Sequence, residues 1–283
     1  MIEANVYAPP RLVAGPEECY FYHTMELPGV GLVEGEWDLR ENVAAYLGNV
    51  DLRGKRVLEM GAASGFLTFA MERMGAEVVA YDLSEQQAWD VVPYADQDVE
   101  GFLAERREHI RRLNNSWWLA HRLLGSRARV VYGTAYDVPA AIGAVDVCTF
   151  GCILQHLRDP FLALHQALRL TRELVVVTDL PPPGYFAGRR YTAWYHRLWQ
   201  RLPWLRPRMS EWLRAESISF RPEPAAGAPK ETWWLLAPET VARMIGVLGF
   251  DLVSLTFHLQ KNRGHDILLY TVVGQRRRGR AIG

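Results

Sequence analysis

A buried segment that runs straight into a glycine-rich turn limits the folds open to this chain. Residues 55–61 (KRVLEMG) are apolar and end in glycine, which predicts a buried strand. The chain turns through 61–65 (GAASG), and 66–75 reads as a helix closed by glycine. A second strand follows and ends in Asp82. A strand, turn, helix and strand in this order are typical of a parallel sheet whose ligand site lies at the carboxyl ends of the strands.

The alternation of strand and helix signals continues along most of the chain. Residues 85–124 read as mostly helical with a break at Pro93, and Asp159 is the expected N-cap of a later helix. Further strands are expected at 128–137, 144–151, 172–180, 251–259 and 266–274. This pattern predicts an α/β fold. It is a Rossmann-like, doubly wound, mostly parallel seven-stranded sheet with an antiparallel C-terminal hairpin, an N-terminal arm and a helical lid insertion.

The same pattern divides the chain into segments with separate tasks. We expect an N-terminal arm or cap at 1–50, a cofactor-binding core at 51–180, a Trp/Arg-rich substrate lid insertion at 181–230, completion of the core by a helix and the terminal hairpin at 231–275, and a basic tail at 276–283.

Composition excludes several classes of protein. The 283 residues carry 32 basic and 32 acidic side chains, so no overall positive charge draws the chain to nucleic acid. Three cysteines are too few for a disulfide framework or a zinc site, and no metal-ligand cluster stands out. The chain lacks the pattern of a signal peptide or of a membrane span, so we expect a cytoplasmic protein.

The glycine spacing separates two cofactor classes. A dinucleotide site requires glycine at positions 1, 3 and 6 of the turn. Here Gly61 and Gly65 occupy positions 1 and 5, and Ala63 stands at position 3. This spacing favours S-adenosyl-L-methionine (SAM), with S-adenosyl-L-homocysteine (SAH) as product, over a nicotinamide cofactor. A turn that serves helix packing alone is the third reading.

These segments resemble class I SAM-dependent methyltransferases. The resemblance runs from about Leu52 to Asp179 and again from Trp233 to Gly274. More narrowly, HTMELPG, GEWDLR, DLRGKRVLEMGAASGF and GCILQHLRDPFLAL are similar to the branch labelled tRNA wobble-uridine (mo5U34) methyltransferase-like. The resemblance implies a SAM site with the methionyl end at Glu59, Gly61, Ala63, Ser64 and Gly65; the ribose at Asp82; the adenine at Leu83, Ser84, Ala135 and Tyr136; the sulfonium at Gly151 and Cys152; and Trp37 and Arg40 of the arm closing over the cofactor.

His156 is the candidate catalytic residue. It follows the fourth strand of the core by a few positions, where the reacting methyl group is expected, and imidazole can act as a general base near neutral pH. The alternative is that His156 braces the helix that begins at Asp159. The carboxymethyl-transferring members of the branch have tyrosine before this histidine, whereas this chain has Gln155, which weakens the tRNA assignment.

The insertion after the fifth strand is the candidate substrate lid. Residues 189–214 hold four tryptophans and seven arginines, which suit a ring-bearing or sugar substrate, an RNA surface or an oligomer contact; packing on the core is the remaining reading. The substrate-binding candidates are Tyr185, Tyr191, Trp194 and Trp199.

The sequence therefore predicts a SAM-dependent methyltransferase that acts on a small-molecule or sugar acceptor, with oxygen as the expected nucleophile. A tRNA-modifying enzyme and a non-catalytic SAM-binding protein are the alternatives, and homo-oligomerisation is left open.

Overall fold

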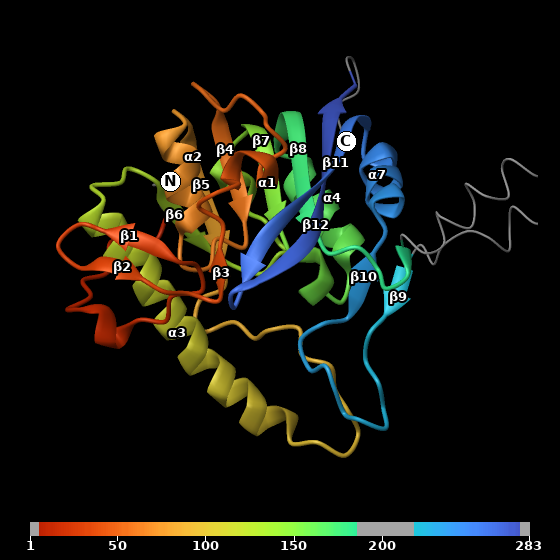
Figure 1. Cartoon of the computed structure of the whole chain (residues 1–283), viewed down its shortest axis with the longest axis horizontal. Coiled ribbons are helices and arrows are strands. Elements are labelled where there is room, and N and C mark those ends of the chain that lie inside the picture. Colours follow the sequence, from red (N-terminus) through yellow and green to blue (C-terminus); the bar gives the residue numbers. More distant parts are fainter. Residues whose placement is uncertain (1–5, 186–217, 278–283) are drawn as a thin grey trace, which may run out of the picture.

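One mixed sheet forms the centre of the molecule. The computed structural model describes residues 6–185 and 218–277, and the sheet in it has eight strands in the order β3-β11-β12-β8-β7-β4-β5-β6 (Figure 1). Their bounds are β3 (Trp37–Asp38), β4 (Arg56–Met60), β5 (Glu77–Asp82), β6 (Arg129–Tyr132), β7 (Val145–Gly151), β8 (Thr171–Asp179), β11 (Phe250–Asn262) and β12 (His265–Arg276).

The strand directions confirm the predicted fold. Strands β8, β7, β4, β5 and β6 run parallel, so their carboxyl ends meet at one edge of the sheet. The terminal strands β11 and β12 form an antiparallel hairpin, and β12 pairs antiparallel with β8. The arm adds an eighth strand, β3, to the seven that the sequence predicted.

Helices cover both faces of the sheet, as a doubly wound fold requires. Buried side chains of α1 (Val43–Tyr46), α2 (Phe66–Arg73) and α3 (Val99–Leu123) belong to one core cluster. Those of α4 (Pro160–Leu168) and α7 (Pro238–Val247) belong to the other. The three 3-10 turns are η1 (Pro16–Glu18), η2 (Ala140–Ile142) and η3 (Leu154–His156).

The long helix α3 begins later than the sequence suggested. Residues 85–98 are not helical, although the pattern predicted mostly helix over 85–124 with a break at Pro93. Asp98 is the N-cap of α3, and its side chain accepts a hydrogen bond from the Gly101 N–H at 2.9 Å. The segment before it instead forms a loop beside the carboxyl ends of the strands.

Two small hairpins flank the sheet. Strands β1 (Met25–Leu27) and β2 (Gly31–Val33) pair antiparallel in the arm. Strands β9 (Ile218–Phe220) and β10 (Trp234–Leu236) pair antiparallel in the segment that returns from the insertion. Among residues 6–185 and 218–277 we find no helix with the length and apolar character needed to cross a bilayer.

The N-terminal arm passes from the edge strand β6 to the opposite side of the sheet, where it forms the other edge strand, β3. Near its start, the Ala8 N–H donates to the Val130 carbonyl of β6 at 2.9 Å. At its end, Trp37 of β3 pairs with Asn262 of β11, at the opposite edge (Figure 1). Between these points the arm runs past the carboxyl ends of β5 and β4, where the glycine turn lies.

Candidate functional site

The glycine turn after β4 has the tight backbone that its sequence predicted. Gly61, Ala63 and Gly65 all take positive φ, at +80°, +49° and +89°. The Gly61 N–H donates to the Tyr81 carbonyl of β5 at 2.8 Å, which joins the two strand ends. The positive φ of Gly61 favours glycine, and a Cβ there would also lie 2.7 Å from the end of the Ile153 side chain.

Asp82 links the end of β5 to this turn. One carboxylate oxygen accepts the Ala63 N–H at 2.7 Å, and the other accepts the Leu83 N–H at 2.7 Å. Burial raises the pKa of the carboxyl, and the backbone donors oppose that shift. A carboxylate oxygen can accept more than one hydrogen bond, so this half-buried group can also bind a pair of ligand hydroxyls.

Glu59 is a buried carboxyl in β4 just before the turn. Its side chain is 2% exposed, and one oxygen accepts a hydrogen bond from the Thr68 hydroxyl. The other oxygen has no hydrogen-bond partner among the described residues. Burial, together with the nearby charge of Asp82, raises the pKa of Glu59 to about 8. A cationic or hydrogen-bond-donating ligand group would satisfy the unpaired oxygen.

The end of β7 supplies a second strained position. Cys152 takes φ +52°, and its N–H donates to the Thr178 carbonyl at 2.8 Å. A Cβ at Gly151 would lie 2.8 Å from the Tyr46 hydroxyl, so the backbone passes close to α1. Burial raises the pKa of the Cys152 thiol, which therefore stays protonated at neutral pH.

His156 is held in one tautomer by the segment before β10. Its Nδ1 lies 2.6 Å from the Glu231 carbonyl, and only a protonated nitrogen can bond to a carbonyl oxygen. The neutral ring therefore carries its proton on Nδ1, and Nε2 is the nitrogen that can accept one. Burial lowers the pKa of His156, so the neutral form predominates at pH 7.

The loops expected beside the adenine are anchored at both sides. The Tyr81 hydroxyl lies 3.0 Å from the carbonyls of both Thr134 and Asp137, which fixes the loop that carries Ala135 and Tyr136. The Tyr136 hydroxyl in turn donates to the Asp90 carboxylate. On the other side, Ser84 is buried, and its N–H donates to the Gln87 side chain at 2.6 Å.

Of the two arm residues expected to close over the cofactor, Trp37 is buried and Arg40 is exposed. Trp37 is buried, and its ring N–H donates to the Tyr22 hydroxyl at 3.1 Å. Arg40 is exposed and forms a bidentate pair with Asp38 at 2.8 and 2.7 Å. The Arg40 guanidinium is thus paired with Asp38 of β3 and not with the glycine turn, so closure of Arg40 over the cofactor stays a prediction.

The lid candidates fall largely outside the described residues, which omit Tyr191, Trp194 and Trp199. Tyr185 is buried, its hydroxyl donates to Glu239 of α7 at 2.8 Å, and its ring lies 5.9 Å from that of Phe257. These contacts pack Tyr185 against the core, and its role in substrate binding stays a prediction.

Sequence reasoning missed two residues at this end of the sheet, His23 and Asp179. Ser64 is fully buried, and its hydroxyl accepts the backbone N–H of His23 at 3.0 Å, so the arm touches the turn directly. Asp179 ends β8 beside Cys152 and is 1% exposed. One Asp179 oxygen accepts the Leu180 N–H at 2.8 Å, and the other has no hydrogen-bond partner among the described residues. The sequence contained a signal for Asp179, because an aspartate ends this strand just as Asp82 ends β5.

Within residues 6–185 and 218–277, no group of three His, Cys, Asp or Glu side chains could hold a metal ion.

Comparison with protein families points to one class. Residues 58–176 match the family model described as a methyltransferase domain. This range starts in β4 and ends in β8, so it contains the glycine turn, Asp82, Cys152 and His156. A search of curated proteins found no match.

Several solved methyltransferase structures show a distant likeness. Magnesium protoporphyrin IX methyltransferase from Synechocystis PCC 6803 with bound SAH has 13% identity over 84% of this chain and 82% of its own, with TM-score 0.47. The N1-methyltransferase of 1,6-didemethyltoxoflavin from Burkholderia thailandensis has 13% identity over 84% and 77%, with TM-score 0.47. The N-terminal domain of EvdMO1 with SAH and D-fucose has 17% identity over 90% of both chains, with TM-score 0.48.

Proposed function

We propose that this chain is a SAM-dependent methyltransferase. The observation that carries the proposal is the Asp82 carboxylate, which ends β5 and is fixed to the glycine turn by the Ala63 N–H at 2.7 Å. The Asp82 carboxylate can accept hydrogen bonds from the two hydroxyls of a diol, and a ligand can approach the backbone of the glycine turn beside it closely. The match of residues 58–176 to a methyltransferase domain supports the same function.

The residues present fit SAM. Asp82 would bind the ribose hydroxyls, with Leu83, Ser84, Ala135 and Tyr136 beside the adenine. The unpaired oxygen of Glu59 would accept a hydrogen bond from the ammonium group of the methionyl end. SAM supplies a methyl group on positively charged sulfur, and the buried, acidic surroundings of Glu59 and Asp82 suit a cation.

The same geometry disfavours a dinucleotide. A pyrophosphate needs free backbone N–H groups at the start of the helix after the first strand. Here Ala63 stands at position 3 of the turn, before α2 begins at Phe66, and its N–H is already engaged by Asp82, while Glu59 is a second carboxyl close to the turn. A cationic ligand group would favour the ionised form of these two buried carboxyls, whose pKa values burial raises, whereas a pyrophosphate would gain no such interaction.

His156 is the proposed general base, and a hydroxyl of a small molecule or sugar is the proposed acceptor. The Nδ1 contact with the Glu231 carbonyl directs the basic nitrogen, Nε2, away from that anchor. A neutral imidazole can take the proton of a hydroxyl as the oxygen is methylated. In-line positioning provides much of the rate of such a transfer, so His156 assists and need not be indispensable.

Calorimetric titration with SAH tests the cofactor assignment. Wild type should bind SAH, and Asp82→Ala should weaken binding by roughly 1.5–3 kcal/mol because charge-assisted hydrogen bonds are lost. Asp96→Ala removes an exposed carboxyl and should leave the affinity unchanged. Wild-type protein that binds no SAH at millimolar concentration would refute the proposed function.

Nitrogen-15 NMR tests the state of His156. We expect the neutral Nδ1–H tautomer and a titration midpoint below that of an ordinary histidine, because burial lowers the pKa. His121 is an internal reference, since its Nε2 faces the Ala128 carbonyl at 2.9 Å and should show the opposite tautomer. A protonated His156 at pH 7 would contradict the role of base.

With any acceptor that wild type methylates, His156→Ala should lower turnover about 10²-fold while SAH affinity is kept.

A further inference from the structure

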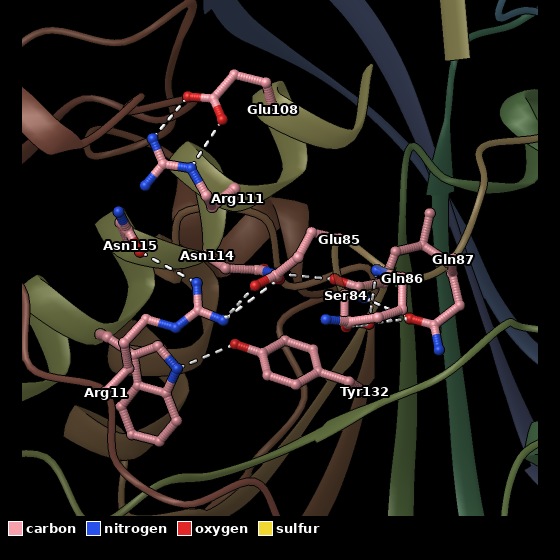
Figure 2. A network of polar contacts seen from close by, with 12 residues as sticks. Arg11, Ser84, Glu85, Gln86, Gln87, Glu108, Arg111, Asn114, Asn115 and Tyr132 are labelled. Carbon is pink, nitrogen blue, oxygen red and sulfur yellow. Dashed lines mark hydrogen bonds and ion pairs between the residues drawn. The ribbon is translucent and has the colours of Figure 1, made fainter. Parts of the chain in front are cut away.

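Arg11 of the arm is held between two parts of the molecule that the sequence separates widely. Its guanidinium donates to Glu85 at 2.9 and 3.3 Å and to the Asn115 side-chain oxygen of α3 at 3.1 Å. Figure 2 shows the three side chains converging, with Ser84 next to Glu85. We call Arg11, Glu85 and Asn115 the arm clasp. Glu85 follows Asp82 by three positions, so the arm clasp anchors the loop after β5, which directly follows the proposed ribose-binding carboxylate.

Helix α3 supports both sides of the clasp. The Asn114 side-chain N–H donates to the Leu83 carbonyl at 3.0 Å, and the Asn115 side-chain N–H donates to the Glu18 carbonyl at 3.0 Å. These two asparagines are 2% and 3% exposed. Buried amides that are bonded at fixed positions define a single arrangement of their partners. The loop after β5 and the arm therefore rest on adjacent residues of one helix.

The arm continues from the clasp to the glycine turn. The Ser116 hydroxyl accepts the Tyr20 N–H at 2.9 Å and donates to the Tyr20 carbonyl at 2.6 Å. Three residues later, the His23 N–H donates to Ser64 in the turn. A single stretch of arm thus contacts the loop beside the adenine and the turn beside the methionyl end.

We propose that Arg11 is a positioning residue for the cofactor. The arm clasp holds loop 83–87 in the conformation that binds SAM, so docking of the arm and binding of the cofactor stabilise each other. This inference rests on the proposed function, because it needs SAM or SAH in the site. Coupling between two binding events is reciprocal, so SAH should also fix the arm.

The first test compares SAH affinities by calorimetry. Arg11→Met keeps the aliphatic part of the side chain and removes all three contacts, and it should weaken SAH binding about fivefold, the upper range for a part-exposed ion pair. Glu85→Gln should have a smaller effect in the same direction. The double variant should lose less than the product of the two factors, because both substitutions break one interaction.

Arg111→Met is the matched control. Arg111 lies on α3, the helix that carries Asn115, and pairs with Glu108 at 2.7 and 2.6 Å. This pair lies apart from Arg11 in Figure 2, and its contacts are confined to the exposed face of α3. Its loss should leave SAH affinity unchanged, which separates the arm clasp from a general effect of removing an arginine.

Amide hydrogen exchange separates positioning from simple destabilisation. In wild type, SAH should slow exchange of the Tyr20 amide, and in Arg11→Met this protection should largely disappear. Arg11→Lys keeps the charge opposite Glu85 and should restore part of both effects. Wild-type affinity and Tyr20 protection in Arg11→Met would overturn the inference while leaving the proposed function intact. Absence of SAH binding by wild type would overturn both.

Discussion

Asp179, like Glu59, is a buried carboxyl with one oxygen that has no hydrogen-bond partner among the described residues. It ends β8 and lies at the same sheet edge as Cys152. Burial raises the pKa of its carboxyl to about 7, and backbone N–H groups of Leu180 and Gln155 reduce the shift. A buried carboxyl with an unpaired oxygen lowers stability, and such groups concentrate where a ligand completes their hydrogen bonds.

This carboxyl should make stability depend on pH. The pKa of Asp179 is higher in the folded protein than the value of about 3.9 in an unfolded chain, so folding stability falls as pH rises between these two values. Asp179→Asn keeps an oxygen for the Leu180 N–H and cannot ionise. Its gain in unfolding free energy should be larger at pH 8 than at pH 5 by about 2–3 kcal/mol.

Urea unfolding at the two pH values measures this difference. Asp96→Asn, at an exposed position, provides the matched loss of one carboxyl and should show no comparable pH dependence. An equal effect of Asp179→Asn at pH 5 and pH 8 would mean that Asp179 ionises normally in the folded protein.

Residues with a local reason for their type could be predicted from the sequence. Gly61 and Gly65 belong to the turn after β4, Asp82 ends β5, and the structure joins Asp82 to that turn through the Ala63 N–H. His23 could not be placed, because its contact with Ser64 depends on the path of the arm across the sheet. Asp179 has a local signal as a strand end, but its burial comes from neighbouring strands.

At the scale of elements, the start of α2 depends on Gly65. This residue has φ +89°, and a Cβ there would lie 2.6 Å from the Phe69 ring and 2.7 Å from the Trp117 ring. Gly65→Ala combines backbone strain with overpacking, so it should lower the unfolding free energy by about 2–4 kcal/mol and weaken SAH binding.

Gly54→Ala separates these two causes. Gly54 has φ +70°, but its Cβ would have no atom within 4 Å. Its substitution should cost only the backbone strain, about 1 kcal/mol, with SAH affinity kept. Urea unfolding and calorimetry measure both quantities, and equal losses for the two variants would show that contacts with Phe69 and Trp117 do not matter.

The limits of element prediction are clearest in α3. The sequence pattern predicted mostly helix over 85–124 with a break at Pro93, but the helix starts at Val99 after the Asp98 cap. The segment from 85 to 98 instead contacts other parts of the chain: Glu85 binds Arg11, and Asp90 accepts from Tyr136. Tertiary contacts of this kind override local propensity, and a single sequence does not display them.

At the scale of the whole molecule, the mostly parallel sheet and its antiparallel terminal hairpin followed from the alternation of strand and helix signals. Parallel strands need crossover helices, and the terminal hairpin needs none, so these strand directions were predictable. The arm was not. From residue 6 onward, the arm contacts the main sheet through the two-residue strand β3 and through Ala8 on β6, and the rest of its course is set by hydrogen bonds to α3, to Glu85 and to the turn.

The course of the arm also constrains the order in which the protein can fold. Ala8 docks on β6 and Trp37 docks on β11, so one stretch of chain needs both edges of the finished sheet. Those residues leave the ribosome before β6 and long before β11. The pairing of β3 with β11 therefore has to wait until the terminal hairpin has been synthesised, and this part of arm docking should be among the last events of folding.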